Sequence, residues 1–181
     1  PYAGIVDFNP PGAITVTGTF ELAASSSAIV RFTDDPGNAT VHTLNGPVTI
    51  STGVFHIGQA TVVAIGSITV MTGTLEMHDL ALFKGVLIDV RNNGAAGLGR
   101  LKLYDNSGGL TGGPTLTSTS PASRLEIQVD GIVDVSSATF LRLSTAGFQI
   151  GAAANLVAFS TVEFKGPLAP GTTAINFGDT G

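Results

Sequence analysis

Two of the three histidines in the chain are spaced so that they can be neighbours after folding. His56 and His78 lie 22 residues apart, and His78 belongs to the run Glu-Met-His-Asp at 76–79. In a repeat with 22-residue coils, His56 would lie beneath His78, with two carboxylates beside the pair. Imidazole nitrogens and carboxylate oxygens bind zinc and similar metals, so that arrangement could hold a metal ion. The alternative is that all three histidines, His42 included, occupy solvent-facing strand positions.

Two acidic turns offer oxygen atoms to a calcium ion. Their sequences are Asp-Asp-Pro-Gly-Asn at 34–38 and Asp-Asn-Ser-Gly-Gly at 105–109. Neither turn has the spaced ligand set of an EF-hand, and Asp, Asn and Gly are also the residues that ordinary turns use. We therefore predict no cofactor. Five residues remain as candidate metal ligands: Asp34, Asp35, Asn38, Asp105 and Asn106.

No set of residues in the sequence predicts an enzyme. Glycoside hydrolysis needs two carboxylates about 5–9 Å apart, and the best pair available is Asp130 and Asp134, four residues apart across a bend. Solvated outward positions are the simpler interpretation of the pair. The chain has no cysteine to serve as a nucleophile, and no Gly-x-Ser-x-Gly elbow is present.

Composition narrows the class of partner. Charged residues make up 12% of the chain, about half the usual share of a soluble domain, and the net charge is −5. No basic stripe is present, so we expect no nucleic-acid partner. No apolar run approaches the ~20 residues of a membrane helix, so we expect no membrane insertion. Low charge with abundant Thr, Ser and Gly favours an extracellular or cell-surface protein.

An internal repeat indicates which elements position these residues. Its pattern is apolar–x–apolar, a small-residue bend that usually contains Gly, and then apolar–x–apolar. Five segments carry it: 48–57, 68–77, 14–22, 141–150 and 125–135. The first two start 20 residues apart, a register that aligns His56 with Glu76 and His78 with Gly58 instead of stacking the two histidines.

Each copy is interpreted as two short strands joined by a corner at the glycine. Side chains alternate along a strand, so Ile50, Phe55 and Ile57 are expected to face a core. Thr49, Ser51 and His56 would then face outward. Apolar strand centres recur about every 6–8 residues along the chain, which predicts three strands per coil and roughly 16–22 residues per coil. The fold class is therefore an all-β solenoid in a single domain, 1–181, with loop insertions near 91–100 and 105–123.

The repeat resembles the rungs of bacterial secreted β-helices, such as autotransporter passengers and filamentous-haemagglutinin-like adhesins. The resemblance covers about half of the chain. It implies a secreted, right-handed parallel β-helix used for surface display, adhesion or assembly. The chain departs from that family because it is short and its rungs are irregular, which leaves open a β-sandwich or jelly-roll subunit of the kind found in pili and capsids.

The function expected from these observations is structural. A solenoid leaves unpaired strand edges at its ends, and such edges invite pairing with another chain. Segments 3–8 and 173–177 are apolar and carry a single charge, Asp7. The sequence thus predicts an extracellular subunit that assembles with copies of itself into a filament, sheath or surface layer. The expected assembly edges are Ile5, Val6, Phe8, Ile175 and Phe177.

Three other functions remain open. The first is a cell-surface adhesin or carbohydrate-binding module whose partner is a glycan, which suits low charge and strand faces rich in Thr, Ser and Asn. A β-helix enzyme that degrades polysaccharides and a viral capsid protein rank behind it. The enzyme would need a carboxylate cluster, and a jelly-roll capsid protein would have antiparallel strands.

Overall fold

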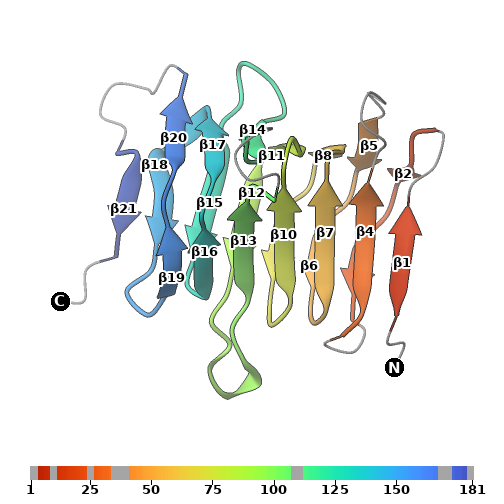
Figure 1. Cartoon of the computed structure of the whole chain (residues 1–181), viewed down its shortest axis with the longest axis horizontal. Coiled ribbons are helices and arrows are strands. Elements are labelled where there is room, and N and C mark those ends of the chain that lie inside the picture. The colour runs from red at the N-terminus through yellow and green to blue at the C-terminus, as the bar shows by residue number, and fades with distance from the viewer. Residues whose placement is uncertain are drawn as a thin grey trace.

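The protein is described by a computed structural model, which covers residues 4–8, 12–23, 27–33, 41–106, 112–166 and 173–178. The chain winds into a β-solenoid of three parallel sheets with seven strands each. We call the three sheets A, B and C, and each turn of the winding contributes one strand to each of them (Figure 1). The predicted all-β solenoid is confirmed, and every described strand pair is parallel, unlike the pairs of a jelly roll.

The strands of each sheet follow the axis of the solenoid in chain order. Sheet A contains β1 (Ile5–Phe8), β4 (Ile29–Thr33), β7 (Val54–Gly58), β10 (Thr74–His78), β13 (Arg100–Tyr104), β16 (Ile132–Val135) and β19 (Asn155–Phe159). Sheet B contains β2 (Thr15–Val16), β5 (Val41–Leu44), β8 (Thr61–Ala64), β11 (Leu82–Gly85), β14 (Thr115–Ser118), β17 (Ala138–Leu141) and β20 (Val162–Lys165). Sheet C contains β3 (Phe20–Leu22), β6 (Val48–Ile50), β9 (Ile68–Val70), β12 (Leu87–Val90), β15 (Leu125–Val129), β18 (Leu143–Ile150) and β21 (Ile175–Phe177).

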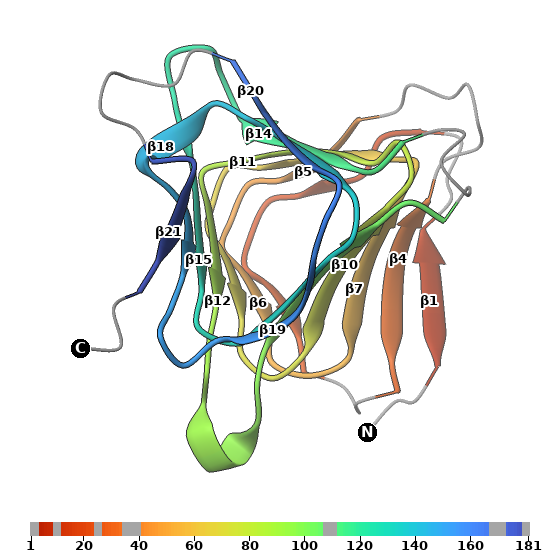
Figure 2. The same cartoon turned by 60° about the vertical axis from the view of Figure 1, so that its left-hand side comes forward.

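The winding is right-handed and the cross-section is roughly triangular. In Figure 1 the strands of sheet A run upward in front, and the chain returns downward behind them while it advances from right to left. Figure 2 looks more nearly along the axis and separates the three sheets into three sides. Within the described residues, no helix has the length and apolar character that a membrane span requires.

The 20-residue register of the repeat is confirmed for its first two copies. Val48 pairs with Ile68, and Val54 pairs with Thr74. Segment 125–135 occupies the same corner, between sheets C and A.

The other two copies of the repeat lie elsewhere in the coil. Segment 14–22 forms β2 and β3, at the corner between sheets B and C. Most of segment 141–150 lies within the one long strand β18, with Gly147 at a φ of 71° inside it. The reason is that every corner joins two strands in which apolar and polar residues alternate. The pattern therefore does not specify which corner a copy occupies.

Most coils are longer than the predicted 16–22 residues. Asp7 lies beside Arg31, 24 residues later, and Glu76 lies beside Lys102, 26 residues later. The extra residues enter at corners. The insertion near 91–100 contains a 3₁₀ turn at Gly94–Ala96 and projects from the body (Figure 2).

The second predicted insertion, 105–123, contains a strand that its composition does not reveal. Thr115–Ser118 forms β14, in register with both β11 and β17. Leu116 supplies its fully buried core side chain. The prediction of a loop over this part was wrong because Thr is β-branched and suits a strand even inside a Gly-rich and Ser-rich segment.

The core consists of inward side chains stacked in columns along the axis. Ile50, Phe55 and Ile57 are fully buried, as predicted. His42 is also fully buried, so its predicted solvent-facing position was wrong. Its strand places it in the inward set, where its Nδ1 accepts a hydrogen bond from the backbone N–H of Ile14 at 3.3 Å. Its ring also lies 5.1 Å from that of Phe32, so a buried polar nitrogen is satisfied.

Candidate functional site

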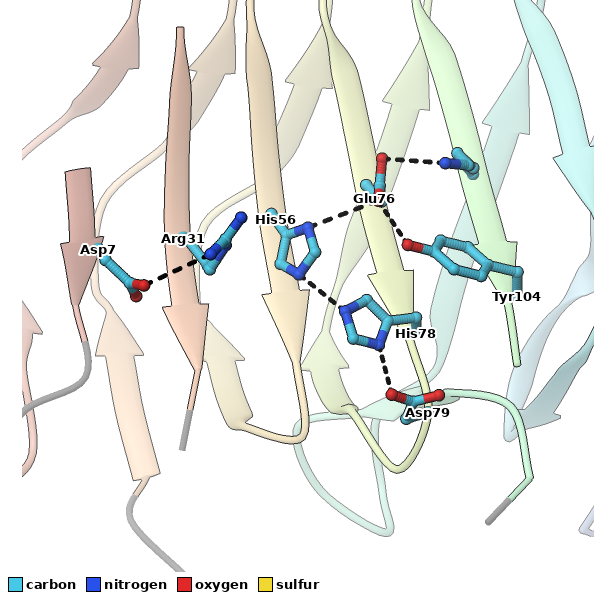
Figure 3. A network of polar contacts seen from close by, with 8 residues as sticks. Asp7, Arg31, His56, Glu76, His78, Asp79 and Tyr104 are labelled. Carbon is cyan, nitrogen blue, oxygen red and sulfur yellow. Dashed lines mark hydrogen bonds and ion pairs between the residues drawn. The ribbon is translucent and has the colours of Figure 1, made fainter. Parts of the chain in front are cut away.

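A row of ionisable side chains crosses the outer face of sheet A. Its members lie beside one another in the strand register: Asp7, Arg31, His56, Glu76, Lys102 and Asp134. The order places each acid next to a base or a histidine, and opposite charges on neighbouring strands stabilise a sheet. Figure 3 shows this row from Asp7 to Glu76, together with His78, Asp79 and Tyr104.

Glu76 is the anchor of the cluster. Its Oε1 accepts a hydrogen bond from the Tyr104 hydroxyl at 2.7 Å, and its Oε2 lies 3.3 Å from Lys102 Nζ. His56 Nδ1 lies 3.5 Å from Oε1. The hydrogen bond from His56, with support from Tyr104 and Lys102, lowers the pKa of Glu76 from 4.5 to about 2 although burial opposes this. Glu76 is therefore a fixed anion near neutral pH.

The same contact acts on Tyr104 in the opposite direction. Burial raises the pKa of the Tyr104 hydroxyl, and the hydrogen bond to the Glu76 carboxylate raises it further. Tyr104 is thus held as a neutral donor. Lys102 Nζ lies 4.5 Å from the centre of the Tyr104 ring, which is a cation–π contact.

His56 and His78 meet through their Nε2 atoms at 2.8 Å. They are not aligned in the strand register, since His56 pairs with Glu76 and His78 with Gly58. The contact is diagonal and depends on Gly58, where a Cβ would lie 2.8 Å from His78 Nε2. The predicted 20-residue register, which aligns His56 with Glu76 and His78 with Gly58, is confirmed. The two rings nevertheless meet, because the missing side chain at Gly58 lets the His78 ring lean across.

Asp79 completes the chain of contacts at the corner after β10. Its Oδ2 lies 2.7 Å from His78 Nδ1. Its backbone is left-handed, with a φ of 53°, and its Oδ1 accepts a hydrogen bond from the backbone N–H of Asn106 at 2.8 Å. Short polar side chains tolerate this conformation best. The corner thus aims Asp79 at the histidine pair.

Glu76, His56, His78 and Asp79 form a continuous line with three contacts. Each contact uses an imidazole nitrogen, so the two rings connect a carboxylate of β10 to the carboxylate at the corner after it.

A depression lies over this line of contacts, with a volume of about 470 Å³. Its lining residues are Ile29, Arg31, Val54, His56, Glu76, His78, Tyr104 and Asn106. Neither Arg31 nor Tyr104 was singled out in the sequence. Arg31 pairs with His56 and Tyr104 pairs with His78, across coils longer than the sequence predicts.

The candidate metal ligands do not form a site in the described part of the chain. No group of three or more His, Asp or Glu side chains among the described residues is arranged to hold a metal ion. Asn106 lines the depression, and its backbone binds Asp79. Asp105, the residue before it, is also described, whereas Asp34, Asp35 and Asn38 lie outside the described residues.

The predicted carboxylate pair is not brought together. Asp134 lies on the outer face of sheet A, beside Lys102. The carboxyl group of Asp130 lies over Gly151, at the end of sheet C. The bend between β15 and β16 turns the chain from one sheet to the next, so the two side chains belong to different faces.

The predicted assembly edges lie in terminal strands of the sheets. β1 is the first strand of sheet A and β21 the last strand of sheet C. Ile5, Val6 and Phe177 are 52%, 38% and 58% exposed. Phe8 and Ile175 pack partly against the core, and the Phe8 ring stacks on Phe32 at 5.3 Å.

Comparisons of the chain with protein-family models, with curated proteins and with solved structures find no match. The function of the protein is therefore inferred from its fold and its side-chain geometry.

Proposed function

We propose that the protein is an extracellular structural subunit that binds copies of itself end to end, with the last coil of one copy stacked on the first coil of the next. The observation that carries this proposal is the apolar character of both end coils. Ile5 and Val6 are exposed at one end, and Leu156, Val157 and Phe177 are 48%, 54% and 58% exposed at the other. Exposed strand edges of this kind favour pairing with another chain.

The inward columns support a parallel continuation. One column runs from Phe8 through Phe32 to Phe159 at the far end. Stacking would place Phe159 of one copy beside Phe8 of the next, as Phe8 already stacks on Phe32 within one copy. Such a contact joins unlike surfaces and repeats without closing, so it produces an open filament.

An outward column of sheet C supports the same register. It begins at Glu21 and ends at Asn176. Between them its members are polar: Thr49, Thr69, Asp89, Gln128 and Gln149. Stacking would place an amide donor of Asn176 against the Glu21 carboxylate, which is a charge-assisted hydrogen bond.

The test is the mass of the protein in solution as a function of concentration, measured by light scattering. The edge variants are Ile5→Lys and Phe177→Lys, which place a charge on each end without opening the core. The matched controls are Ile65→Lys and Leu80→Lys, in the middle of the chain. The native side chains there are hydrophobic and 55% and 60% exposed. We expect the wild type and the controls to form growing oligomers, and the edge variants to stay smaller.

Electron microscopy gives an independent check. Seven strands per sheet at a strand spacing of about 4.8 Å predict an axial repeat of about 34 Å per copy. A wild-type protein that stays monomeric at every concentration overturns the proposal. It is also overturned if the lysines at positions 65 and 80 reduce the mass as much as the edge lysines do.

A further inference from the structure

We propose that the depression on sheet A binds a small polyhydroxylated carboxylate, such as a sugar acid, with the carboxylate held by Arg31 and the hydroxyl groups by Tyr104 and Asn106. This site is separate from the end coils that carry the proposed assembly. It lies on the outer face of β4, β7, β10 and β13, where Arg31, His56, His78 and Tyr104 line the depression. Figure 3 shows these side chains side by side on neighbouring strands.

The accessible charge of the lining favours an anion. Arg31 contributes one positive charge and Glu76 one negative charge. The charges also differ in how far they reach the surface. Glu76 is 15% exposed and directs its oxygens at its three partners, whereas the Arg31 side chain is 30% exposed. A ligand thus meets the cation first.

Arg31 has hydrogen-bonding capacity that the protein does not use fully. Its Nη1 donates a hydrogen bond to Asp7 Oδ2 at 3.5 Å, the outer limit of such a bond, between two partly exposed side chains. Its Nε is buried and has no hydrogen-bond partner among the described residues. Because a guanidinium can bind a carboxylate through its two Nη groups, a ligand carboxylate can replace the long contact to Asp7 with a bidentate one.

The rest of the lining suits a hydroxylated ring better than a bare anion. The Tyr104 hydroxyl uses its proton for Glu76 and still has lone pairs that can accept a hydrogen bond. Asn106 is exposed and presents a carboxamide, which is both donor and acceptor. Ile29 and Val54 form an apolar wall for C–H groups. A volume of about 470 Å³ is in the range of small-molecule sites.

The experiment is calorimetric titration of the full chain with glucuronate, with glucose and acetate as the two comparison ligands. It is carried out in the Phe177→Lys background, so that assembly and binding are measured separately. The key variant is Arg31→Gln. The matched control is Arg91→Gln, which removes an arginine paired with a carboxylate on sheet C, Asp89, at 2.8 Å. Thermal unfolding of both variants checks that they fold.

We expect glucuronate to bind at least about tenfold more tightly than glucose or acetate, because the carboxylate and the hydroxyls both contribute. Arg31→Gln should lose about tenfold in affinity for glucuronate, and Arg91→Gln should not change it. If glucose binds as tightly as glucuronate, Arg31 does not hold a ligand carboxylate. If acetate binds as tightly as glucuronate, Tyr104 and Asn106 do not hold ligand hydroxyl groups. No binding of glucuronate, or equal losses in the two variants, overturns the site.

Discussion

Replacing Glu76 by Gln tests whether this carboxylate holds the polar cluster of sheet A together. A lowered pKa means that the folded state binds the charged form more strongly than the unfolded chain does. The fall from 4.5 to about 2 corresponds to ~3 kcal/mol at ~1.36 kcal/mol per pKa unit. Because the cluster faces solvent, we discount this value for screening and expect Glu76→Gln to lower the free energy of unfolding by about 2 kcal/mol near neutral pH.

The sign of the pH dependence follows from the same shift. The stabilisation from Glu76 is fully present above the unfolded pKa of 4.5 and is lost as the pH falls toward about 2. Urea unfolding followed by circular dichroism, repeated from neutral to acidic pH, should show the wild type and Glu76→Gln converging at the acid end.

The matched control is Glu163→Gln, in an exposed pair with Lys165 whose side chains are 56% and 54% exposed. Surface ion pairs contribute little, so this change should have only a small effect at any pH. A difference between the wild type and Glu76→Gln that stays constant down to about pH 2 would refute the reasoning, since it would not come from the carboxylate charge.

Three further substitutions test the packing. Gly58→Ala places a Cβ 2.8 Å from His78 Nε2 and should break the histidine contact at a cost of about 1–2 kcal/mol; an unchanged imidazole NMR spectrum would contradict this. Gly66→Ala places a Cβ 2.6 Å from a backbone oxygen and should cost about 1–3 kcal/mol in thermal unfolding, whereas Gly12→Ala, with open space around it, should cost far less. Phe83→Ala removes a fully buried ring and should cost about 3–5 kcal/mol in urea unfolding; a loss under about 1 kcal/mol would contradict a dry core there.

The solenoid could be predicted because its rule is local. Alternating apolar residues on both sides of Gly53 predict two strands and a corner, and Gly53 has the φ of 76° that favours glycine. The 20-residue spacing of two copies then determines their register. Coil length in the other turns could not be predicted, because corners lie outside the sheets and accept extra residues without disturbing the pairing.

The candidate site was only partly visible in the sequence. The spacing of His56 and His78 and the acids at 76–79 drew attention to the right segment. The diagonal contact depends on a residue without a side chain, Gly58, and on the left-handed corner at Asp79. Arg31 and Tyr104 could not be found by spacing, because the coils on either side of the histidines have different lengths.

The projecting corner after β12 has a consequence for how new sequence can enter this fold. Asn93 to Gly97 form a small closed turn there, and β13 nevertheless pairs in register with β10. The number of residues in each strand is thus constrained by pairing with its neighbours, whereas the number of residues in this corner is not. A foreign peptide could therefore be grafted at Gly94–Ala96 and displayed on the outside of the solenoid, with the cost limited to closing a longer loop.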